Sequence, residues 1–344
     1  FKESGPKGAE REKEVLRIAA RGGIRIIGPN CIGLMVPGKK LNASFGGDLP
    51  AAGSIGYFSQ SGSLLAAIVD MARDTSMGFS KLISIGNKAD VDELAIIRSL
   101  GADDETRVIA GYLETISDGD AFVRQAERIS REKPILLMKA GFTVAGAKAA
   151  SSHTGRLAET ESAYECVFER AGVIRCESMK DQFDFARAFA YQPLPNGPHV
   201  AVIANAGGAG IMATDAIERV GLELAQFAPE TQSKLSGSEE LSRAANVNNP
   251  IDLLGDALAD RYEFALRTVL DDPNTDTVLV LLSPHAMTEC AETARAIVRV
   301  ANENGCKKPI LACFLGASRV AEAVGVLREG MIPPYDSPEG AVKA

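Results

Sequence analysis

The residue best suited to covalent chemistry is His153, which lies in the segment 141–155, GFTVAGAKAASSHTG. This segment consists almost entirely of Gly, Ala, Ser and Thr, so it has few side chains that can anchor it to a core. A histidine on a mobile loop can act as a nucleophile that accepts a group at one place and delivers it at another. A structural histidine, a general base and a metal ligand are the alternatives that the loop alone leaves open.

A carboxylate that could serve this histidine is Glu114. It directly follows a predicted strand over 107–113, so we expect it at the carboxyl edge of a sheet, where doubly wound proteins bind ligands. There it could accept a hydrogen bond from one ring nitrogen of His153 and leave the other nitrogen free to attack. A helix N-cap or a solvent-facing acid is the alternative for Glu114.

Two turns rich in small residues could bind phosphate, QSGSL over 60–64 and NAGGAG over 205–210. Each lies between a predicted strand and a predicted helix, so free backbone amides and the positive end of a helix dipole meet there. Two such turns facing each other could hold one phosphoryl group. The alternatives are a tight connection without a ligand and, for GGAG, a dinucleotide-binding turn. The candidate phosphate-binding residues are Gln60, Ser61, Gly62, Ser63, Asn205, Ala206, Gly207, Gly208 and Ala209.

Other polar residues are expected to have structural roles. Asp90 and Asp92 follow a strand and could cap a helix, Asp92 being the better N-cap. Asp252 is a further acid at a strand end, and His199 and His285 flank strands. The six cysteines are scattered without a CxxC pair, so we expect neither a metal site nor a disulfide framework.

Strands alternate with helices along most of the chain, which predicts parallel, doubly wound sheets. A helix over 10–21 precedes a short buried strand at 24–27, and residues 37–53 are predicted to form a loop. A second unit has strands near 55–59, 79–85, 107–113, 135–139 and 173–176, with helices at 64–73, 92–100, 119–131, 158–171 and 180–190. After a linker over 192–198, a third unit has strands near 200–204, 222–225, 277–282, 309–314 and 331–332, with helices at 211–220, 260–270, 287–304 and 317–328.

Composition excludes several classes of protein. The chain has 344 residues and a net charge of −8, which argues against a general nucleic-acid surface. It has neither an apolar run long enough to cross a membrane nor a visible signal peptide, and its scattered single cysteines favour a reducing, cytoplasmic setting. The missing initial Met and the helix-like last residues indicate a fragment of a longer polypeptide.

Eight motifs together resemble one family, the nucleoside-diphosphate-forming acyl-CoA synthetases of the succinyl-CoA synthetase superfamily. They occur in the family's order and span nearly the whole chain. They are GPNCIGLM (28–35), LNASF (41–45), GYFSQSGSL (56–64), GNKADVDE (86–93), YLE (112–114), SSHTG (151–155), NAGGAG (205–210) and NPIDLLGD (249–256).

The resemblance implies an acid–thiol ligase that interconverts acyl-CoA, phosphate and ADP with carboxylic acid, CoA and ATP. An acyl phosphate forms first, His153 then accepts the phosphoryl group with Glu114 steadying its ring, and the loop swings to deliver the group. The two small-residue turns would bind the phosphoryl group during this transfer. The GPNC turn would contact CoA or substrate through Gly28, Pro29, Asn30 and Cys31.

The resemblance also implies the domain organisation. Residues 1–48 would end a Rossmann-like CoA-binding domain. Residues 49–192 and 197–344 would form two flavodoxin-like domains, the first carrying the phosphohistidine loop. ADP or ATP and Mg²⁺ would bind an ATP-grasp module on another subunit or fused segment, in an oligomer without nucleic acid or membrane partners.

Two rival functions remain at this point. One is a catalytically silent, regulatory acyl-CoA-synthetase-like region of a protein lysine acetyltransferase, against which the retention of His153 and Glu114 argues. The other is a dinucleotide-dependent dehydrogenase, which rests only on NAGGAG. The sequence does not name the acyl group.

Overall fold

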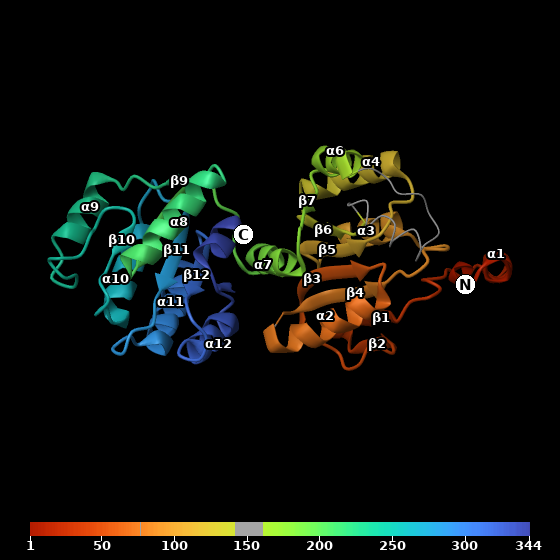
Figure 1. Cartoon of the computed structure of the whole chain (residues 1–344), viewed down its shortest axis with the longest axis horizontal. Coiled ribbons are helices and arrows are strands. Elements are labelled where there is room, and N and C mark those ends of the chain that lie inside the picture. Colours follow the sequence, from red (N-terminus) through yellow and green to blue (C-terminus); the bar gives the residue numbers. More distant parts are fainter. Residues whose placement is uncertain (76, 142–160) are drawn as a thin grey trace. The chain divides into compact units, whose positions relative to one another are not determined.

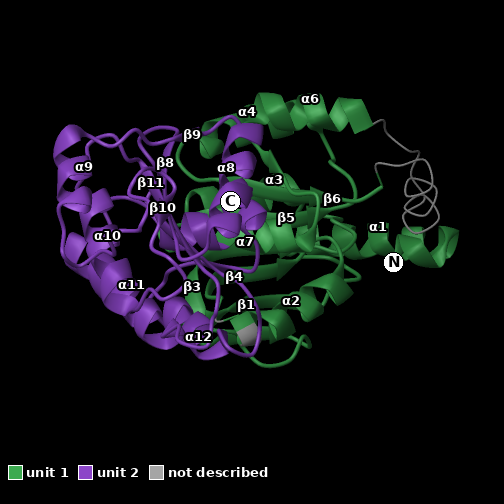
Figure 2. Cartoon of the chain, turned by 60° about the vertical axis from the view of Figure 1, so that its left-hand side comes forward, with its two compact units in different colours: residues 1–186 green, residues 187–344 purple. Residues whose placement is uncertain are grey.

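A computed structural model describes residues 1–75, 77–141 and 161–344 of the chain. They form two compact units, unit 1 (Phe1–Ala186) and unit 2 (Arg187–Ala344), which Figure 2 shows in different colours. Each unit contains its own sheet with helices packed against it (Figure 1). The α/β class that the alternating pattern predicts is confirmed.

The sheet of unit 1 has seven strands in the order β2-β1-β4-β3-β5-β6-β7. Strands β3 to β7 run parallel, and counted from β3 their order is 2-1-3-4-5, the flavodoxin-like order. β1 and β2 form an antiparallel hairpin that extends the sheet beside β4. The strands are β1 (Gly33–Val36), β2 (Leu41–Ser44), β3 (Ala52–Ser59), β4 (Phe79–Ser84), β5 (Val108–Leu113), β6 (Ile135–Lys139) and β7 (Ile174–Arg175).

Helices cover both faces of this sheet. Phe58 of β3 belongs to a buried cluster with Ile97 and Phe122 on one face. The preceding residue, Tyr57, points to the other face, as successive strand residues do, and its hydroxyl donates to Gln182 Oε1 at 2.9 Å. The helices are α1 (Pro6–Arg21), α2 (Gly62–Thr75), α3 (Glu93–Gly101), α4 (Gly119–Ser130), α6 (Glu161–Ala171) and α7 (Met179–Tyr191), with 3-10 turns η1 (Lys2–Ser4) and η2 (Pro37–Lys39).

Two predictions for the first fifty residues are wrong. The segment 24–27 is not a strand, and Ile24 is 63% exposed. Its backbone forms a hydrogen bond with the loop between β4 and α3 instead of with a strand: Val91 N donates to Ile26 O at 3.1 Å. The predicted loop over 37–53 contains strand β2, since the turn η2 reverses the chain and lets β2 pair with β1.

Unit 2 is built on the same plan. β8 lies between β10 and β11 in the order β10-β8-β11-β12-β13, β9 also pairs with β8, and every one of these pairings is parallel. The strands are β8 (His199–Ala204), β9 (Glu223–Leu224), β10 (Ile251–Asp252), β11 (Thr277–Leu282), β12 (Ile310–Phe314) and β13 (Pro334–Tyr335). The helices are α8 (Gly207–Arg219), α9 (Pro229–Ser236), α10 (Ala259–Leu270), α11 (Cys290–Asn304), α12 (Ala321–Glu329) and α13 (Pro338–Lys343).

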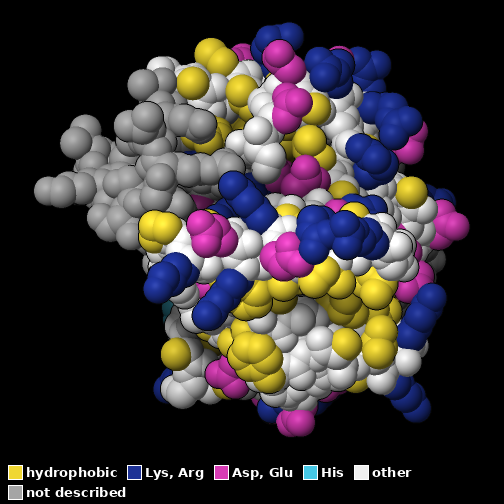
Figure 3. Space-filling view, turned by 90° about the vertical axis from the view of Figure 1, so that its right-hand side faces the viewer, with side chains coloured by type: hydrophobic (Ala, Val, Ile, Leu, Met, Phe, Trp, Pro, Cys, Tyr) yellow, Lys and Arg dark blue, Asp and Glu magenta, His cyan; other side chains and the backbone are white. Residues whose placement is uncertain are grey.

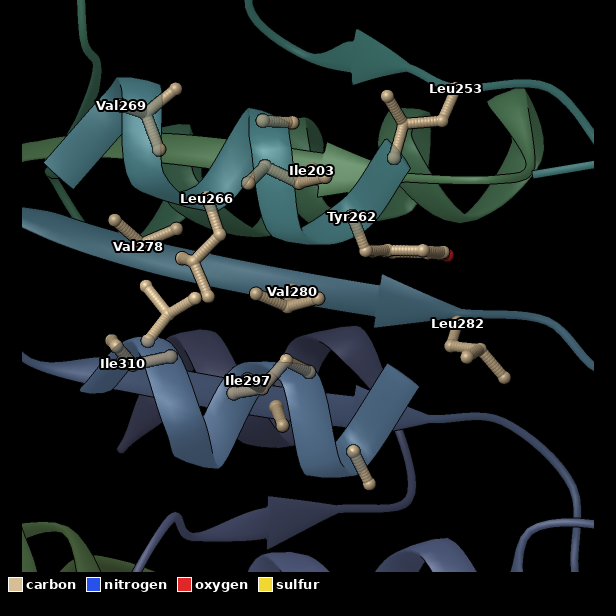
Figure 4. Packing of buried hydrophobic residues seen from close by; sticks show 14 of the residues in the cluster. Ile203, Leu253, Tyr262, Leu266, Val269, Val278, Val280, Leu282, Ile297 and Ile310 are labelled. Atoms are coloured by element: carbon tan, nitrogen blue, oxygen red, sulfur yellow. The ribbon is translucent and has the colours of Figure 1, made fainter. Parts of the chain in front are cut away.

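The core of unit 2 follows from alternation along β11. Val278, Val280 and Leu282 share one face of this strand and pack with side chains of α10 and α11, including Leu266 and Ile297 (Figure 4). All five side chains are at most 1% exposed. This packing holds the carboxyl ends of the central strands at a fixed edge of the sheet.

Several boundaries in unit 2 differ from the prediction. β10 and α9 were not predicted, and β13 lies at Pro334–Tyr335 instead of 331–332. The difference that matters for function is the start of α8, which begins at Gly207 and not at residue 211. α2 likewise begins at Gly62, two residues before its predicted start. The glycines predicted to form turns are therefore the first residues of helices.

Part of the surface of unit 1 is apolar. Six hydrophobic residues within 1–48 are exposed by 42% to 79%, namely Phe1, Val15, Ile18, Ile24, Leu41 and Phe45. Figure 3 looks onto the side that carries α1 and shows hydrophobic side chains gathered beside charged ones. Within the described part of the chain, no helix combines the length and apolar composition needed to cross a bilayer.

Candidate functional site

The site in unit 1 lies where the strand order reverses, between the carboxyl ends of β3 and β5. Gln60 follows β3 and Glu114 follows β5, and these two strands are neighbours in the sheet. Gln60 Oε1 accepts hydrogen bonds from Glu114 N at 2.9 Å and from Thr115 N at 3.2 Å. In doubly wound sheets this reversal point is where ligands bind. The Gln60 side-chain oxygen thus holds the turn that carries Glu114.

The start of α2 presents free backbone donors beside this turn. Ser61 Oγ accepts from Leu64 N at 3.3 Å and so satisfies one amide of the first helical turn. The amides of Gly62 and Ser63 have no hydrogen-bond partner among the described residues. Unpaired amides at a helix N-terminus, together with the helix dipole, are suited to bind an anion.

Unit 2 repeats this arrangement at its own reversal point. Asn205 follows β8, and its side chain forms two hydrogen bonds with the residue after β11: Oδ1 accepts from Ser283 N at 2.8 Å, and Nδ2 donates to Ser283 O at 2.9 Å. α8 then starts from the extended residue Ala206 without a side-chain cap. The amides of Gly207, Gly208 and Ala209 have no partner in the part of the chain that the structure describes.

Removal of the Asn205 side chain should loosen this edge of unit 2. Asn205 is 2% exposed, so Asn205→Ala leaves the backbone N and O of Ser283 without their partners. We expect a loss of about 1–3 kcal/mol in the free energy of unfolding and faster hydrogen exchange at Ser283 N. Asn302→Ala, at an exposed helical position, is the matched control and should change neither. Unchanged exchange at Ser283 N would contradict the bridging role of Asn205.

The GPNC turn docks on the loop between β4 and α3. Asn87 N donates to Pro29 O at 2.9 Å and Ala89 N to Gly28 O at 3.0 Å. Asp90 accepts from Ile26 N at 2.7 Å and pairs with Arg25, whose hydrogen bond lowers the pKa of the Asp90 carboxyl. The predicted CoA-contacting turn and the motif GNKADVDE are therefore parts of one local structure.

Gly86 is the tightest point of this docking. Its φ is +48°, and an added Cβ would lie 2.3 Å from Pro29 O and 2.3 Å from Asn30 O, which are backbone atoms. Gly86→Ala must push the GPNC turn away, and we expect it to cost about 1–3 kcal/mol, measured as a lower midpoint of thermal unfolding. Gly119→Ala is the control, because a Cβ there meets nothing within 4 Å. Equal unfolding midpoints for the two variants would contradict this reading.

A small polar cavity brings several predicted residues together. Asn30, Gln60 and Glu114 line it, so a predicted CoA contact, a predicted phosphate contact and the predicted orienting acid share one site. Asn30 Nδ2 donates to Asn87 Oδ1 at 3.3 Å. Cys31 is not in the lining, and its thiol faces Ile27 O at 3.5 Å. The other lining residues are Lys2, Glu3, Gly86, Asn87, Lys88, Thr115 and Ser117.

Sequence reasoning missed the part that Asn87 and Lys88 play. Both belong to the motif GNKADVDE, whose aspartates alone are predicted from the sequence to have a role. Asp92 is the predicted N-cap and accepts from Ala95 N at 2.9 Å, whereas Asp90 is not a cap. A signal was present, since a lysine between a strand and a helix lies at the same edge as the ends of the other strands.

The structure separates some alternatives for the remaining candidates. Glu114 is half-buried and does not cap α4, because Asp118 does so by accepting from Ala121 N at 2.9 Å. Asp252 Oδ1 accepts from Leu254 N at 3.0 Å, and His199 Nδ1 lies 2.8 Å from Asp276 Oδ2. His285 is exposed. His153 lies outside the described residues, so its distance to Glu114 stays a prediction.

Two family models match the chain. The model described as a succinyl-CoA ligase like flavodoxin domain matches residues 52–189. The model described as a Ligase-CoA domain matches residues 200–342. The first range contains the Gln60 and Glu114 site, and the second contains the start of α8.

Relatives of known activity resemble the chain over its whole length. The ADP-forming acetate–CoA ligase I of Archaeoglobus fulgidus is 40% identical over 345 residues. The alpha subunit of ADP-forming acetate–CoA ligase I from Pyrococcus furiosus is 38% identical over 351 residues. The chain is fully covered in both cases but spans only 48% of the first relative and 74% of the second.

A solved structure agrees with these relatives. It is the dinucleotide-forming acetyl-coenzyme A synthetase 1 of Candidatus Korarchaeum cryptofilum in complex with phosphate and ADP. It matches this chain with a TM-score of 0.94 and 36% identity, covering all of this chain and 74% of the other. The likeness therefore extends from the sequence motifs to the fold.

Proposed function

This chain belongs to the family of ADP-forming acetate–CoA ligases, and from that premise we propose that it carries the acyl-transfer and phosphohistidine parts of an acid–CoA ligase. The complete protein would convert acyl-CoA, phosphate and ADP into carboxylic acid, CoA and ATP, reversibly. The observation that carries the proposal is the shared cavity of Asn30, Gln60 and Glu114. In the proposed reaction, the thioester, the phosphate and the acceptor histidine would meet at this cavity.

The proposed reaction has three steps. An oxygen of phosphate attacks the thioester carbonyl, the C–S bond breaks, and an acyl phosphate and CoA form. An unprotonated ring nitrogen of His153 then attacks the phosphorus, the bond from phosphorus to the acyl oxygen breaks, and the carboxylate leaves. Finally an oxygen of ADP attacks the same phosphorus, the P–N bond breaks, and ATP and neutral imidazole result.

Glu114 would act during the second step. The ring nitrogen that does not attack keeps its proton and donates it in a hydrogen bond to the Glu114 carboxylate. The ring becomes positively charged as the P–N bond forms, so a fixed negative charge beside it stabilises the product. The half-buried position of Glu114 supports this role, because partial removal from water strengthens the interaction.

The two helix starts would bind the phosphoryl group. The free amides of Gly62 and Ser63 would hold it in unit 1, and those of Gly207, Gly208 and Ala209 would hold it in unit 2. Each N-terminus contributes roughly 0.3–1 kcal/mol at an exposed position. Helix dipoles of this strength would bind a phosphoryl group less tightly than a cluster of lysines. Weaker binding suits a group that must be transferred onward.

The remaining proposals concern substrates and partners. CoA would bind residues 1–48 together with further protein surface, a view that the exposed side chains of Val15, Ile18 and Phe45 support. ADP or ATP, with Mg²⁺, would bind an ATP-grasp module on a partner subunit or fused segment. We place this oligomeric enzyme in the cytoplasm, and its substrate is a small carboxylic acid.

Isotope transfer tests the proposal. The full-length protein with its ATP-grasp module is incubated with acetyl-CoA, [32P]phosphate, ADP and magnesium, and a panel of other acyl-CoA thioesters follows. We expect phosphate-dependent release of CoA together with labelled ATP and, without ADP, a label on the protein that is acid-labile and base-stable. Absence of phosphate-dependent CoA release with every thioester would refute the proposed activity.

A further inference from the structure

A buried ion pair lies next to the candidate site. Lys88 Nζ is 2.6 Å from Glu93 Oε2, and the two side chains are 4% and 0% exposed. Burying two charges carries a large desolvation cost that their attraction offsets only in good geometry with further hydrogen bonds. A contribution to the stability of the fold is therefore a weak explanation for the presence of this buried ion pair.

Further hydrogen bonds of this pair go to the turn that follows Glu114. Lys88 Nζ donates to Thr115 O at 2.6 Å. Ser117 N donates to Glu93 Oε1 at 2.5 Å, and Ser117 Oγ donates to Glu93 Oε2 at 3.3 Å. Both charged groups are thus used to bind one short backbone segment.

Gln60 binds the same turn through other atoms. It holds the amides of Glu114 and Thr115, while the ion pair holds the carbonyl of Thr115 and the amide of Ser117. Polar side chains from the residue after β3, from the β4–α3 loop and from the start of α3 therefore all bind residues 114–117. A backbone bound at four points fixes the position and direction from which the side chain of Glu114 starts.

The backbone of each residue of the ion pair is fixed by local structure. Lys88 adopts a left-handed backbone with φ +53°, and its amide donates to Ile85 O at 3.0 Å. Glu93 is the first residue of α3, whose start is fixed by the Asp92 cap. The loop of Lys88 also carries Asn87, which binds the GPNC turn.

We propose that Lys88 and Glu93 are positioning residues: their buried ion pair fixes the turn 114–117 and, with it, the place from which the Glu114 carboxylate would act. This inference rests on the proposed function and adds the two residues that align its orienting acid. Alignment matters because a displacement of about 1 Å of a catalytic group can reduce the rate on the order of 100-fold.

Two measurements on the full-length protein test the inference. The first is the rate at which [32P]acetyl phosphate labels the protein, which isolates histidine phosphorylation from thioester cleavage. The second is hydrogen exchange at the amides of Glu114, Thr115 and Ser117, which needs no activity. Lys88→Met should slow labelling roughly 10- to 100-fold and speed exchange at these amides.

Variants separate positioning from general destabilisation. Lys88→Met alone leaves the buried Glu93 carboxylate without its partner, which could unfold the protein. The double variant Lys88→Met/Glu93→Gln removes both charges, so we expect it to stay folded. Lys81→Met is the matched control. Lys81 Nζ lies 2.5 Å from Asp103 Oδ2, and Asp103 precedes β5, whereas Glu114 follows that strand at its other end. Lys81→Met should leave labelling and the exchange at residues 114–117 unchanged.

A double-mutant cycle with Glu114→Gln gives the decisive comparison. If Lys88 acts through Glu114, the loss of labelling caused by Lys88→Met should shrink to less than about threefold once Glu114 is neutral. An equal loss in both backgrounds, or unchanged exchange at residues 114–117, overturns the inference. If the parent protein takes no label, the proposed function fails, and the exchange measurement still decides whether the pair fixes the turn.

Discussion

His153→Ala is expected to abolish both the acid-labile label and the overall ligase reaction. The substitution removes the only proposed phosphoryl acceptor between the acyl phosphate and ADP, so no slower route through the same groups remains. The loss should reach the detection limit, at least about 10³-fold in kcat. Labelling with [γ-32P]ATP or with acyl-CoA and [32P]phosphate, followed by acid and base treatment, measures it.

The same variant separates the two halves of the reaction. Formation of the acyl phosphate does not involve His153, so phosphate-dependent CoA release should survive as a single turnover. His199→Ala is the control, because His199 lies at the start of β8 beside Asp276, away from the proposed chemistry. Retention of label in His153→Ala would remove this histidine from the mechanism.

The second large effect is expected for Glu114→Gln. The amide keeps the size of the side chain but not its negative charge, so the imidazolium that forms during phosphorylation loses its counter-ion. We expect the rate of histidine labelling to fall about 10²- to 10⁴-fold, with the KM for the acyl-CoA nearly unchanged. Rapid-quench labelling with acyl-CoA and [32P]phosphate gives the rate.

A conservative control accompanies Glu114→Gln. Glu127→Gln makes the same change on α4, where Glu127 pairs only with the exposed Arg131 in the described structure. It should leave labelling unaltered, and both variants should unfold at temperatures close to that of the parent. A labelling rate in Glu114→Gln equal to that of the parent would exclude Glu114 as the orienting acid.

Most of the strand and helix pattern was accessible from the sequence because apolar residues recur with the periods of strands and helices. β6 at Ile135–Lys139 and β11 at Thr277–Leu282 have the predicted bounds. The pattern failed where local preference was weak. β10 has two residues, and the glycines of α8 are poor helix formers that sequence rules assign to a turn.

The candidate site was predictable in part. The rule that strand ends carry ligands identified Glu114 and the two small-residue turns. It did not reveal that Gln60 and Asn205 use their side-chain amides to bridge neighbouring strand ends, while the first amides of α2 and α8 have no partner among the described residues. It also missed Lys88 and Glu93, since a buried ion pair is recognisable only when its surroundings are known.

The sequence by itself determined the alternation of strands and helices, the small-residue helix starts and the family to which the motifs point. Those features depend on residues that are near each other in the chain. Only the tertiary structure decided that Asn30, Gln60, Lys88 and Glu114 share one cavity. Their meeting depends on the strand order β4-β3-β5 and on the docking of the GPNC turn, and both arise from packing between segments that are far apart in the sequence.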